Sequence, residues 1–208
     1  KKPSQTHGID ESKFIVCDSD SFFDRMNAFF EVSKSEYFLL LLDDYFLNSK
    51  IDSSFMDFIL KFADKFSADY IKLSVTHRNT YYKRKIRSYS GIHQLRINKA
   101  YSVDLYPSLW KKDFIVRLEK QWIFPDKTIW DFEGKIHKIN IEKKCYIYKY
   151  KQSNNNAHFK SSRRLVNEKN MCHIIDCCSF GHGDSMLFNS SSCRQYRRAM
   201  RKQCNMGS

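Results

Sequence analysis

The sequence predicts an α/β protein in which helices flank a mostly parallel sheet. The segment Tyr37–Leu42 is continuously apolar, which is the pattern of a strand buried on both faces. Helical patterns precede and follow it, and a second strand pattern comes next, an order typical of a right-handed crossover unit. Apolar residues make up 42% of the 208 residues, which is enough for the core of one catalytic domain.

The first half of the chain supplies this crossover unit. Phe14–Cys17 is a short apolar run that we expect to form a strand, and the acidic turn of Asp18 and Asp20 follows it. Ser21 can cap the next helix. The apolar positions of that helix recur at helical spacing: Phe22, Phe23, Met26, Phe29 and Phe30.

A second helix follows the apolar strand and leads into another strand. Asp52 or Ser53 can cap this helix. Its apolar positions also keep helical spacing: Phe55, Phe58, Ile59, Phe62 and Phe66. Residues 69–73, with the sequence DYIKL, then have the pattern of a strand.

The second half is less regular. Residues 76–99 are basic and favour a long surface loop, and residues 101–105 favour a strand. Helices are predicted over 107–120 and over 126–137, the latter carrying the sequence WDFEG. Residues 144–150 alternate as a final strand would.

The net charge of the chain limits the classes of partner that it can bind. A formal net charge of +13 suits nucleic acid, an anionic membrane surface or an anionic small ligand such as a nucleotide diphosphate. The longest apolar stretch is too short to span a bilayer, and no leader pattern opens the chain. We therefore expect a cytoplasmic protein that can rest on a membrane through basic side chains. The chain begins without Met, so we also expect a missing upstream segment.

Asp43 and Asp44 are the first candidates for chemistry. They directly follow the apolar strand, and ligands of doubly wound sheets bind at the carboxyl ends of strands. Two carboxylates placed where apolar burial stops have a desolvation cost that a divalent cation would offset. Their hard oxygen atoms suit Mg²⁺ or Mn²⁺. The alternative is that the two acids form a solvated turn.

Two stretches resemble a known family. SFFDRMNAFFEVSKSEYFLLLLDDYF resembles the segment of family 2-type GT-A glycosyltransferases in which a helix leads into the strand bearing a short acidic motif. AYSVDLYPSLWKKDFIVRL followed by IWDFEG resembles the later part of related sugar transferases. The resemblance covers about residues 14–140. It implies a GT-A-like, Rossmann-related fold in residues 1–150, without the family's usual first strand, first helix and nucleotide-binding loop.

The resemblance also implies an activity and its residues. The activity is transfer of a sugar from a nucleotide-diphosphate sugar to an acceptor hydroxyl, in surface polysaccharide or glycoconjugate synthesis. Asp43 and Asp44 would bind Mn²⁺ or Mg²⁺ and the diphosphate of the donor, and Asp18 or Asp20 would lie near the nucleoside. Glu133 is the first choice for the general base that the acceptor hydroxyl needs, and Asp131 is the second.

Basic residues would assist the departure of the nucleoside diphosphate, whose negative charge increases as it leaves. The basic loop from Arg78 to Arg87 can supply such residues, although such a loop is also a common solvated surface. Likewise, a simpler interpretation of Asp131 and Glu133 is that they are polar positions on a helix that packs through its aromatic residues.

Residues 151–208 form a separate compositional unit, a basic, Cys-rich tail that we expect to be poorly ordered. Its Cys and His residues could bind zinc, but no pair of CxxC units occurs, and reduced thiols are the better interpretation. Its arginines support an alternative function, a basic nucleic-acid-binding module. These arginines are Arg194, Arg197, Arg198 and Arg201. No recognised nucleic-acid motif accompanies them, so nucleic acid ranks second as a partner.

Overall fold

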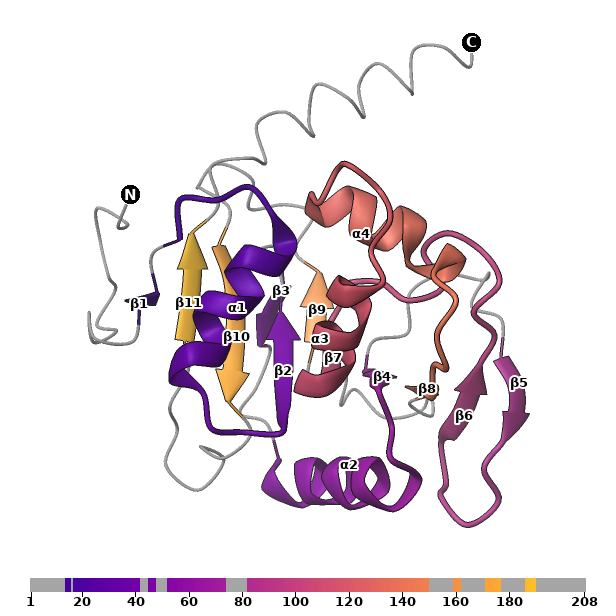
Figure 1. Ribbon diagram of the computed structural model, residues 1–208. Coiled ribbons are helices and arrows are strands. Elements are labelled where there is room, and N and C mark those ends of the chain that lie inside the picture. The colour runs from indigo at the N-terminus through magenta and orange to yellow at the C-terminus, as the bar shows by residue number, and fades with distance from the viewer. Residues whose placement is uncertain are drawn as a thin grey trace, which may run out of the picture.

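A computed structural model gives the fold of the chain (Figure 1). It describes the backbone of residues 14–15, 17–41, 45–47, 52–73, 82–149, 159–161, 171–176 and 186–189. Side chains are described for residues 15, 17–41, 52–73 and 84–149. All statements below concern these residues.

Two helices confirm the patterns of the first half. Helix α1 spans Phe22–Val32, and the Ser21 hydroxyl accepts a hydrogen bond from the Asp24 N–H at 3.3 Å. Helix α2 spans Ser53–Phe66, and a carboxylate oxygen of Asp52 accepts from the Ser54 N–H at 2.9 Å. Each cap satisfies a backbone donor that has no partner within its helix.

Two shorter helices lie in the second half. Helix α3 spans Lys112–Lys120, and α4 spans Ile129–Lys135 and continues into the 3₁₀ turn η2, Ile136–Lys138. Both lie inside the helices predicted for this region. Helix α3 begins five residues later than predicted because residues 108–111 are extended as strand β7.

The main sheet has nine strands in the order β1-β11-β10-β2-β7-β4-β8-β6-β5. Six of them lie between residues 37 and 148: β2 (Tyr37–Leu41), β4 (Tyr70–Lys72), β5 (Tyr82–Lys85), β6 (Ile92–Leu95), β7 (Ser108–Lys111) and β8 (Cys145–Tyr148). The others are β1 (Phe14–Ile15), β10 (Met171–Asp176) and β11 (Met186–Asn189). A separate pair joins β3 (Tyr45–Leu47) to β9 (Phe159–Ser161).

The prediction of a mostly parallel sheet is wrong, because the sheet is mixed. Only β4 with β8 and β1 with β11 are parallel neighbours among the strands described. Strand β2 is buried along its whole length as predicted, yet both of its neighbours, β7 and β10, are antiparallel. A strand that is buried on both faces indicates that helices cover both faces of the sheet, but it does not determine the direction of the neighbouring strands.

Two further segments differ from the sequence prediction. Residues 82–95 form an antiparallel hairpin of β5 and β6 inside the predicted loop. The prediction missed this hairpin because an edge strand carries charged side chains, which obscure the alternation of apolar and polar residues. Residues 101–105 form a turn instead of a strand, and Tyr101 has a φ of +61°, which interrupts extended backbone. Strands β10 and β11 also bring residues of the 151–208 region into the sheet.

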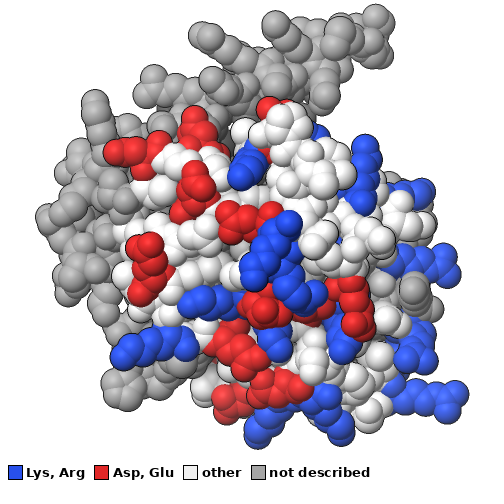
Figure 2. All heavy atoms as spheres, in the orientation of Figure 1, with Lys and Arg blue, Asp and Glu red and all other residues white. Residues whose placement is uncertain are grey.

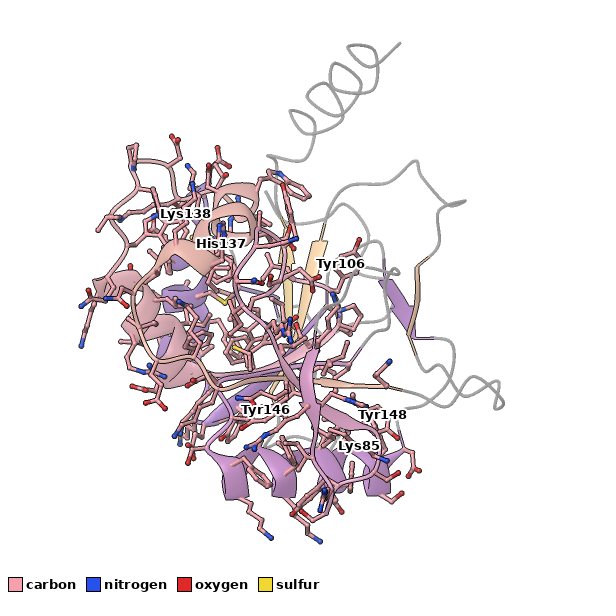
Figure 3. All side chains as sticks on the ribbon, turned by 90° about the vertical axis from the view of Figure 1, so that its right-hand side faces the viewer. Lys85, Tyr106, His137, Lys138, Tyr146 and Tyr148 are labelled. Carbon is pink, nitrogen blue, oxygen red and sulfur yellow. The ribbon has the colours of Figure 1, made fainter. Side chains whose placement is uncertain are left out.

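Helices pack on both faces of the sheet. Leu39, Ile71 and Leu109 face α2 in one apolar cluster. Leu40, Tyr70 and Trp110 belong to the other cluster, with residues of α1, α3 and α4. Figure 3 shows Tyr146 and Tyr148 on the α2 side and His137 and Lys138, from η2, on the opposite side.

Strands β2, β4 and β8 run in the same direction and end at one edge of the sheet, which we call the carboxyl edge. Leu40, Ser108 and Lys72 are direct register partners, in that order, across β2, β7 and β4. Strand β7 starts at this edge, so the loop 102–107 that precedes it lies there too.

Within the described segments, no helix is long and apolar enough to cross a bilayer. Cys17 and Cys145 are free thiols.

Candidate functional site

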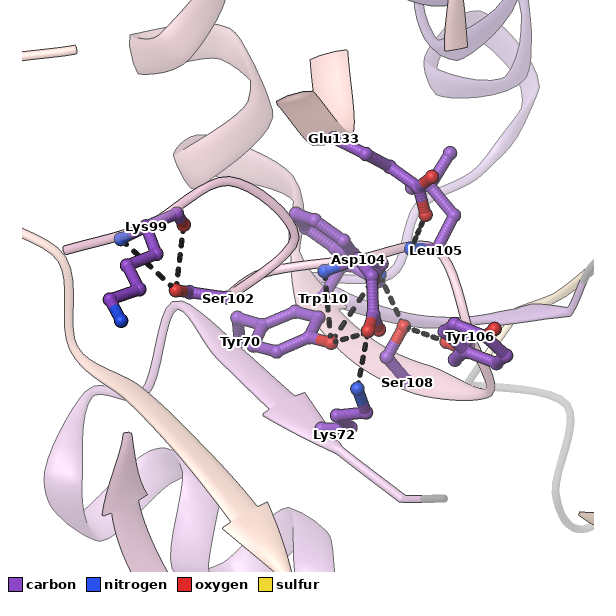
Figure 4. Close-up of polar contacts among 10 residues, drawn as sticks. All are labelled: Tyr70, Lys72, Lys99, Ser102, Asp104, Leu105, Tyr106, Ser108, Trp110 and Glu133. Carbon is purple, nitrogen blue, oxygen red and sulfur yellow. Dashed lines mark hydrogen bonds and ion pairs between the residues drawn. The ribbon is translucent and has the colours of Figure 1, made fainter. Parts of the chain in front are cut away.

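A buried ion pair lies at the carboxyl edge. Lys72, the last residue of β4, donates a hydrogen bond from its ammonium group to a carboxylate oxygen of Asp104 in the loop 102–107 (Figure 4). Both residues are only 3% exposed. Moving two charges out of water is expensive, so a pair in this position is weak evidence for stability and a reason to look for function.

Two tyrosines surround this pair. The Tyr70 hydroxyl donates to Asp104, with 3.0 Å to its carbonyl oxygen and 3.1 Å to a carboxylate oxygen. The Lys72 ammonium lies 5.0 Å from the centre of the Tyr106 ring, which is within cation–π range. Burial raises the pKa of Asp104, although the ammonium of Lys72 acts in the opposite direction. Burial and the adjacent Asp104 carboxylate also hold the pKa of Tyr70 well above its usual value.

Glu133 joins helix α4 to the same loop. One of its carboxylate oxygens accepts a hydrogen bond from the Leu105 N–H at 2.6 Å, and its own carbonyl accepts from the Tyr101 N–H at 3.1 Å. Its exposed fraction is 5%. A charge-assisted bond of this kind fixes the loop beside α4.

A neutral pair completes the cluster. The Trp110 indole N–H donates to the Ser108 hydroxyl oxygen at 2.8 Å, and the hydroxyl donates to the Tyr106 carbonyl. Trp110 is fully buried in the core. The loop 102–107 is therefore held by side chains from β4, β7 and α4. We call these side chains, together with Asp104 of the loop itself, the polar cluster: Tyr70, Lys72, Asp104, Ser108, Trp110 and Glu133.

Asp18 and Asp20, the predicted nucleoside contacts, are exposed and precede α1. Arg25 is buried within α1 and donates to the Ser19 carbonyl at 2.7 Å and to Asp20 at 3.3 Å. Its Nη1 atom has no hydrogen-bond partner among the described residues. The arginine thus holds the acidic turn against the first turn of the helix.

The start of α1 touches the segment that leads into α4. The Phe22 N–H donates to the Lys127 carbonyl at 2.7 Å, and the rings of Phe22 and Phe132 are 4.1 Å apart. The acidic turn, α4 and the loop 102–107 are therefore contiguous. Sequence positions more than a hundred residues apart meet at this side of the molecule.

Asp131 and Glu133 do not converge, although both lie on α4. Residues two apart on a helix do not face each other. The Thr128 hydroxyl caps the helix by accepting from the Asp131 N–H, and it donates to the Asp131 carboxylate, which also pairs with Lys135 at 2.6 Å. Partial burial acts to raise the pKa of Asp131, but hydrogen bonds from Lys135 and Thr128 outweigh it and lower that pKa.

Three predicted site residues, Asp43, Asp44 and Arg78, lie outside the described residues, as do the four arginines considered in the tail. Of the Cys and His residues of the tail, Cys172 and His173 lie in β10, where only the backbone is described, and the others lie outside the described residues. Strand β2 ends at the carboxyl edge with Leu41, two residues before Asp43 in the sequence. Where side chains are described, no group of three or more His, Cys, Asp or Glu could hold a metal ion.

Sequence reasoning missed Tyr70, Lys72 and Asp104. The sequence did contain a signal for Lys72. It stands between two buried apolar residues, Ile71 and Leu73, in a strand that is covered on both faces, and a charged residue is rarely buried there without a partner. Its partner could not be found in this way, since Asp104 is 32 residues further on.

Comparisons of the chain with protein-family models, with curated proteins and with solved structures found no match. We therefore infer function from the site itself.

Proposed function

We propose that this chain is part of a nucleotide-sugar glycosyltransferase that transfers a sugar from a nucleotide-diphosphate sugar to an acceptor hydroxyl. One observation carries the proposal: the polar cluster shares the carboxyl edge with the end of β2, which lies two residues before Asp43 in the sequence. Leu40 and Lys72 are linked through Ser108 in one row, so β2 and β4 are separated by a single strand. Two strand spacings amount to about 10 Å, which a bound nucleotide sugar can span.

The acidic pair suits the donor diphosphate. Asp43 and Asp44 offer only hard oxygen atoms, the donor set that fits Mg²⁺ or Mn²⁺. Asp43 and Asp44 would hold this cation, which when bound neutralises charge on the diphosphate. Asp18 and Asp20, on the turn held by Arg25, would face the nucleoside.

Glu133 is the better candidate for the general base. A base works best when its pKa is close to the operating pH, and the pKa of Asp131 is lowered by its hydrogen bonds. Asp131 is also committed to Lys135 and Thr128. Glu133 instead belongs to the polar cluster, through its bond to Leu105 in the loop 102–107.

The reaction then balances in one displacement. The acceptor oxygen forms a bond to the anomeric carbon, and its proton moves to the Glu133 carboxylate. The bond between the anomeric carbon and the diphosphate oxygen breaks, and the electron pair leaves with the nucleoside diphosphate. The resemblance stated above implies a sugar or glycoconjugate as the acceptor.

Binding of nucleoside diphosphates tests the donor site. Isothermal titration calorimetry with a panel of nucleoside diphosphates should show Mn²⁺-dependent binding to the full chain, and Asp44→Ala should weaken it at least tenfold. Asp57→Ala, at an exposed position of α2, is the matched control and should bind like the unchanged chain. Failure of every nucleotide to bind, with and without Mn²⁺, would overturn the proposal.

Transfer activity tests the base. With a donor identified by calorimetry, Glu133→Gln should lower kcat by about a hundredfold or more while donor binding persists. Asp131→Asn should lower it far less. The opposite ranking would assign the base to Asp131.

A further inference from the structure

The hairpin of β5 and β6 presents a surface of one charge. Between Tyr70 and Val103 the sequence has eight Lys or Arg residues and no Asp or Glu. Five of the cations whose side chains are described are exposed: Lys99, in the loop after the hairpin, and four on or directly beside the hairpin, Arg84, Lys85, Arg87 and Arg96. Figure 2 shows Lys and Arg without Asp or Glu at this side of the molecule, whereas both signs mix over its centre.

These four cations differ from several basic residues elsewhere on the described surface that are held in ion pairs. Lys111 pairs with Glu36, Arg117 pairs with Asp69 and Asp113, and Lys135 pairs with Asp126 and Asp131. None of the four takes part in an ion pair with a described residue. Their charge is therefore available to an external anion.

The position of the hairpin suits a flat partner. Strand β5 is the last strand of the sheet, so one of its sides has no neighbouring strand in the described fold. Arg84 and Lys85 are successive residues of this edge strand, and successive side chains point to opposite faces of a sheet. Arg84 and Lys85 thus flank the sheet edge on both sides, and an anionic plane that approaches the edge would meet both.

The turn of the hairpin carries positive charge but presents no aromatic ring on which a nucleic-acid base could stack. Tyr89 packs on α2, with ring centres 5.0 Å from Phe62 and 5.7 Å from Phe58. Proteins that bind single-stranded nucleic acid combine cations with exposed aromatic rings. The described surface instead matches recognition of phosphate charge alone, which is how basic segments bind anionic lipid headgroups.

We propose that the β5–β6 hairpin is a docking surface for a membrane rich in anionic phospholipids. Each basic residue near such a surface contributes about fivefold in binding. None of these residues belongs to the polar cluster. Arg84, Lys85 and Arg87 do lie in the basic stretch 78–87 considered above for the leaving diphosphate, so membrane docking is measured without any nucleotide sugar present. A charged edge also prevents strand pairing between molecules, so the test must separate that role from membrane binding.

Vesicle sedimentation with the full chain makes this separation. The variant Arg84→Glu/Lys85→Glu/Arg87→Glu keeps a charged edge and so should remain monomeric and folded, while it loses lipid binding. The control variant Lys34→Glu/Lys61→Glu/Lys120→Glu changes the net charge equally at exposed positions on other elements. The vesicles contain phosphatidylcholine alone or with about one third phosphatidylserine.

We expect the unchanged chain and the control to bind only the phosphatidylserine vesicles, and to lose binding at about 0.5 M salt. The hairpin variant should bind about a hundredfold more weakly. Equal loss in both variants would mean that net charge alone is responsible, and would overturn the proposal. Tighter binding of the unchanged chain to DNA or RNA than to these vesicles at equal salt would overturn it in favour of a nucleic-acid surface.

Discussion

The two faces of the sheet are covered in different ways. The face under α2 is closed by apolar side chains and rings, such as Ile59, Phe62 and Ile71, all fully buried. The face under α1, α3 and α4 contains the polar cluster, including Lys72 and Asp104. Ile71 and Lys72 are neighbours in β4, so a step of one residue along the chain separates the two environments.

We infer from this difference that the α2 face contributes to stability alone, whereas the opposite face also contributes to function. Apolar burial stabilises a fold cheaply, whereas a buried ion pair has a desolvation cost that an apolar pair of the same volume avoids. A chain that needed only stability would place the same kind of core on both faces. Changes under α2 should therefore reduce stability alone, and changes in the polar cluster should also alter ligand binding.

The largest effect should come from breaking the buried ion pair. Lys72→Met leaves the Asp104 carboxylate without its cation, so we expect a loss of about 3 to 5 kcal/mol in the free energy of unfolding, measured with urea. Lys72→Met/Asp104→Leu should recover most of this loss. A double variant as unstable as the single one would show that the pair itself stabilises the fold.

A cavity on the α2 face should have a somewhat smaller effect and no functional consequence. Ile71→Ala should lower the free energy of unfolding by about 3 kcal/mol, and Ile71→Val by about 1 kcal/mol. Nucleoside diphosphate binding by the folded fraction should stay unchanged. If Ile71→Ala weakened binding as strongly as Asp44→Ala does, the functional difference between the two faces would be lost.

The neutral pair of the polar cluster should contribute less. Ser108→Ala removes the acceptor of the Trp110 indole N–H and leaves that buried donor unpaired, which should cost about 1 to 2 kcal/mol. Ser108→Thr retains the hydroxyl and serves as the control. Indole fluorescence should shift in the alanine variant, and equal stability of the two variants would contradict this role of the hydroxyl.

The smallest effect concerns the pH dependence of α4. The folded-state pKa of Asp131 is lowered, so its contribution to stability is present above the ordinary pKa of an aspartate and is lost as the pH falls through the folded-state value. Asp131→Asn should be slightly less stable than the unchanged chain at pH 7, by less than about 1 kcal/mol, and this difference should shrink towards pH 3. A difference that grew on acidification would contradict the sign of the shift.

Local patterns predicted the elements better than their arrangement. The periodicity of Phe22–Phe30 and the caps at Ser21 and Asp52 identified α1 and α2, because helix signals lie within one or two turns. The direction of β2 depends on β7, which arrives some seventy residues later. No property of Tyr37–Leu42 contains that information.

The site was predictable to a smaller degree. The acids of WDFEG were predicted as candidates, but nothing in the spacing of Asp131 and Glu133 reveals that one binds Lys135 and the other the backbone of Leu105. Lys72 gave a readable signal as a charge in a buried strand, whereas Asp104 did not, because its burial results from tertiary packing of the loop 102–107.

Hydrogen–deuterium exchange tests the central claim, that the carboxyl edge binds the donor, most directly. The full chain is compared with and without Mn²⁺ and the nucleoside diphosphate that binds most tightly in calorimetry. We predict that protection will concentrate in peptides covering residues 38–46, 102–107 and 129–135, and that α2 and the β5–β6 hairpin will be unchanged. Protection confined to α2 or to the hairpin, with none at the carboxyl edge, would contradict the account.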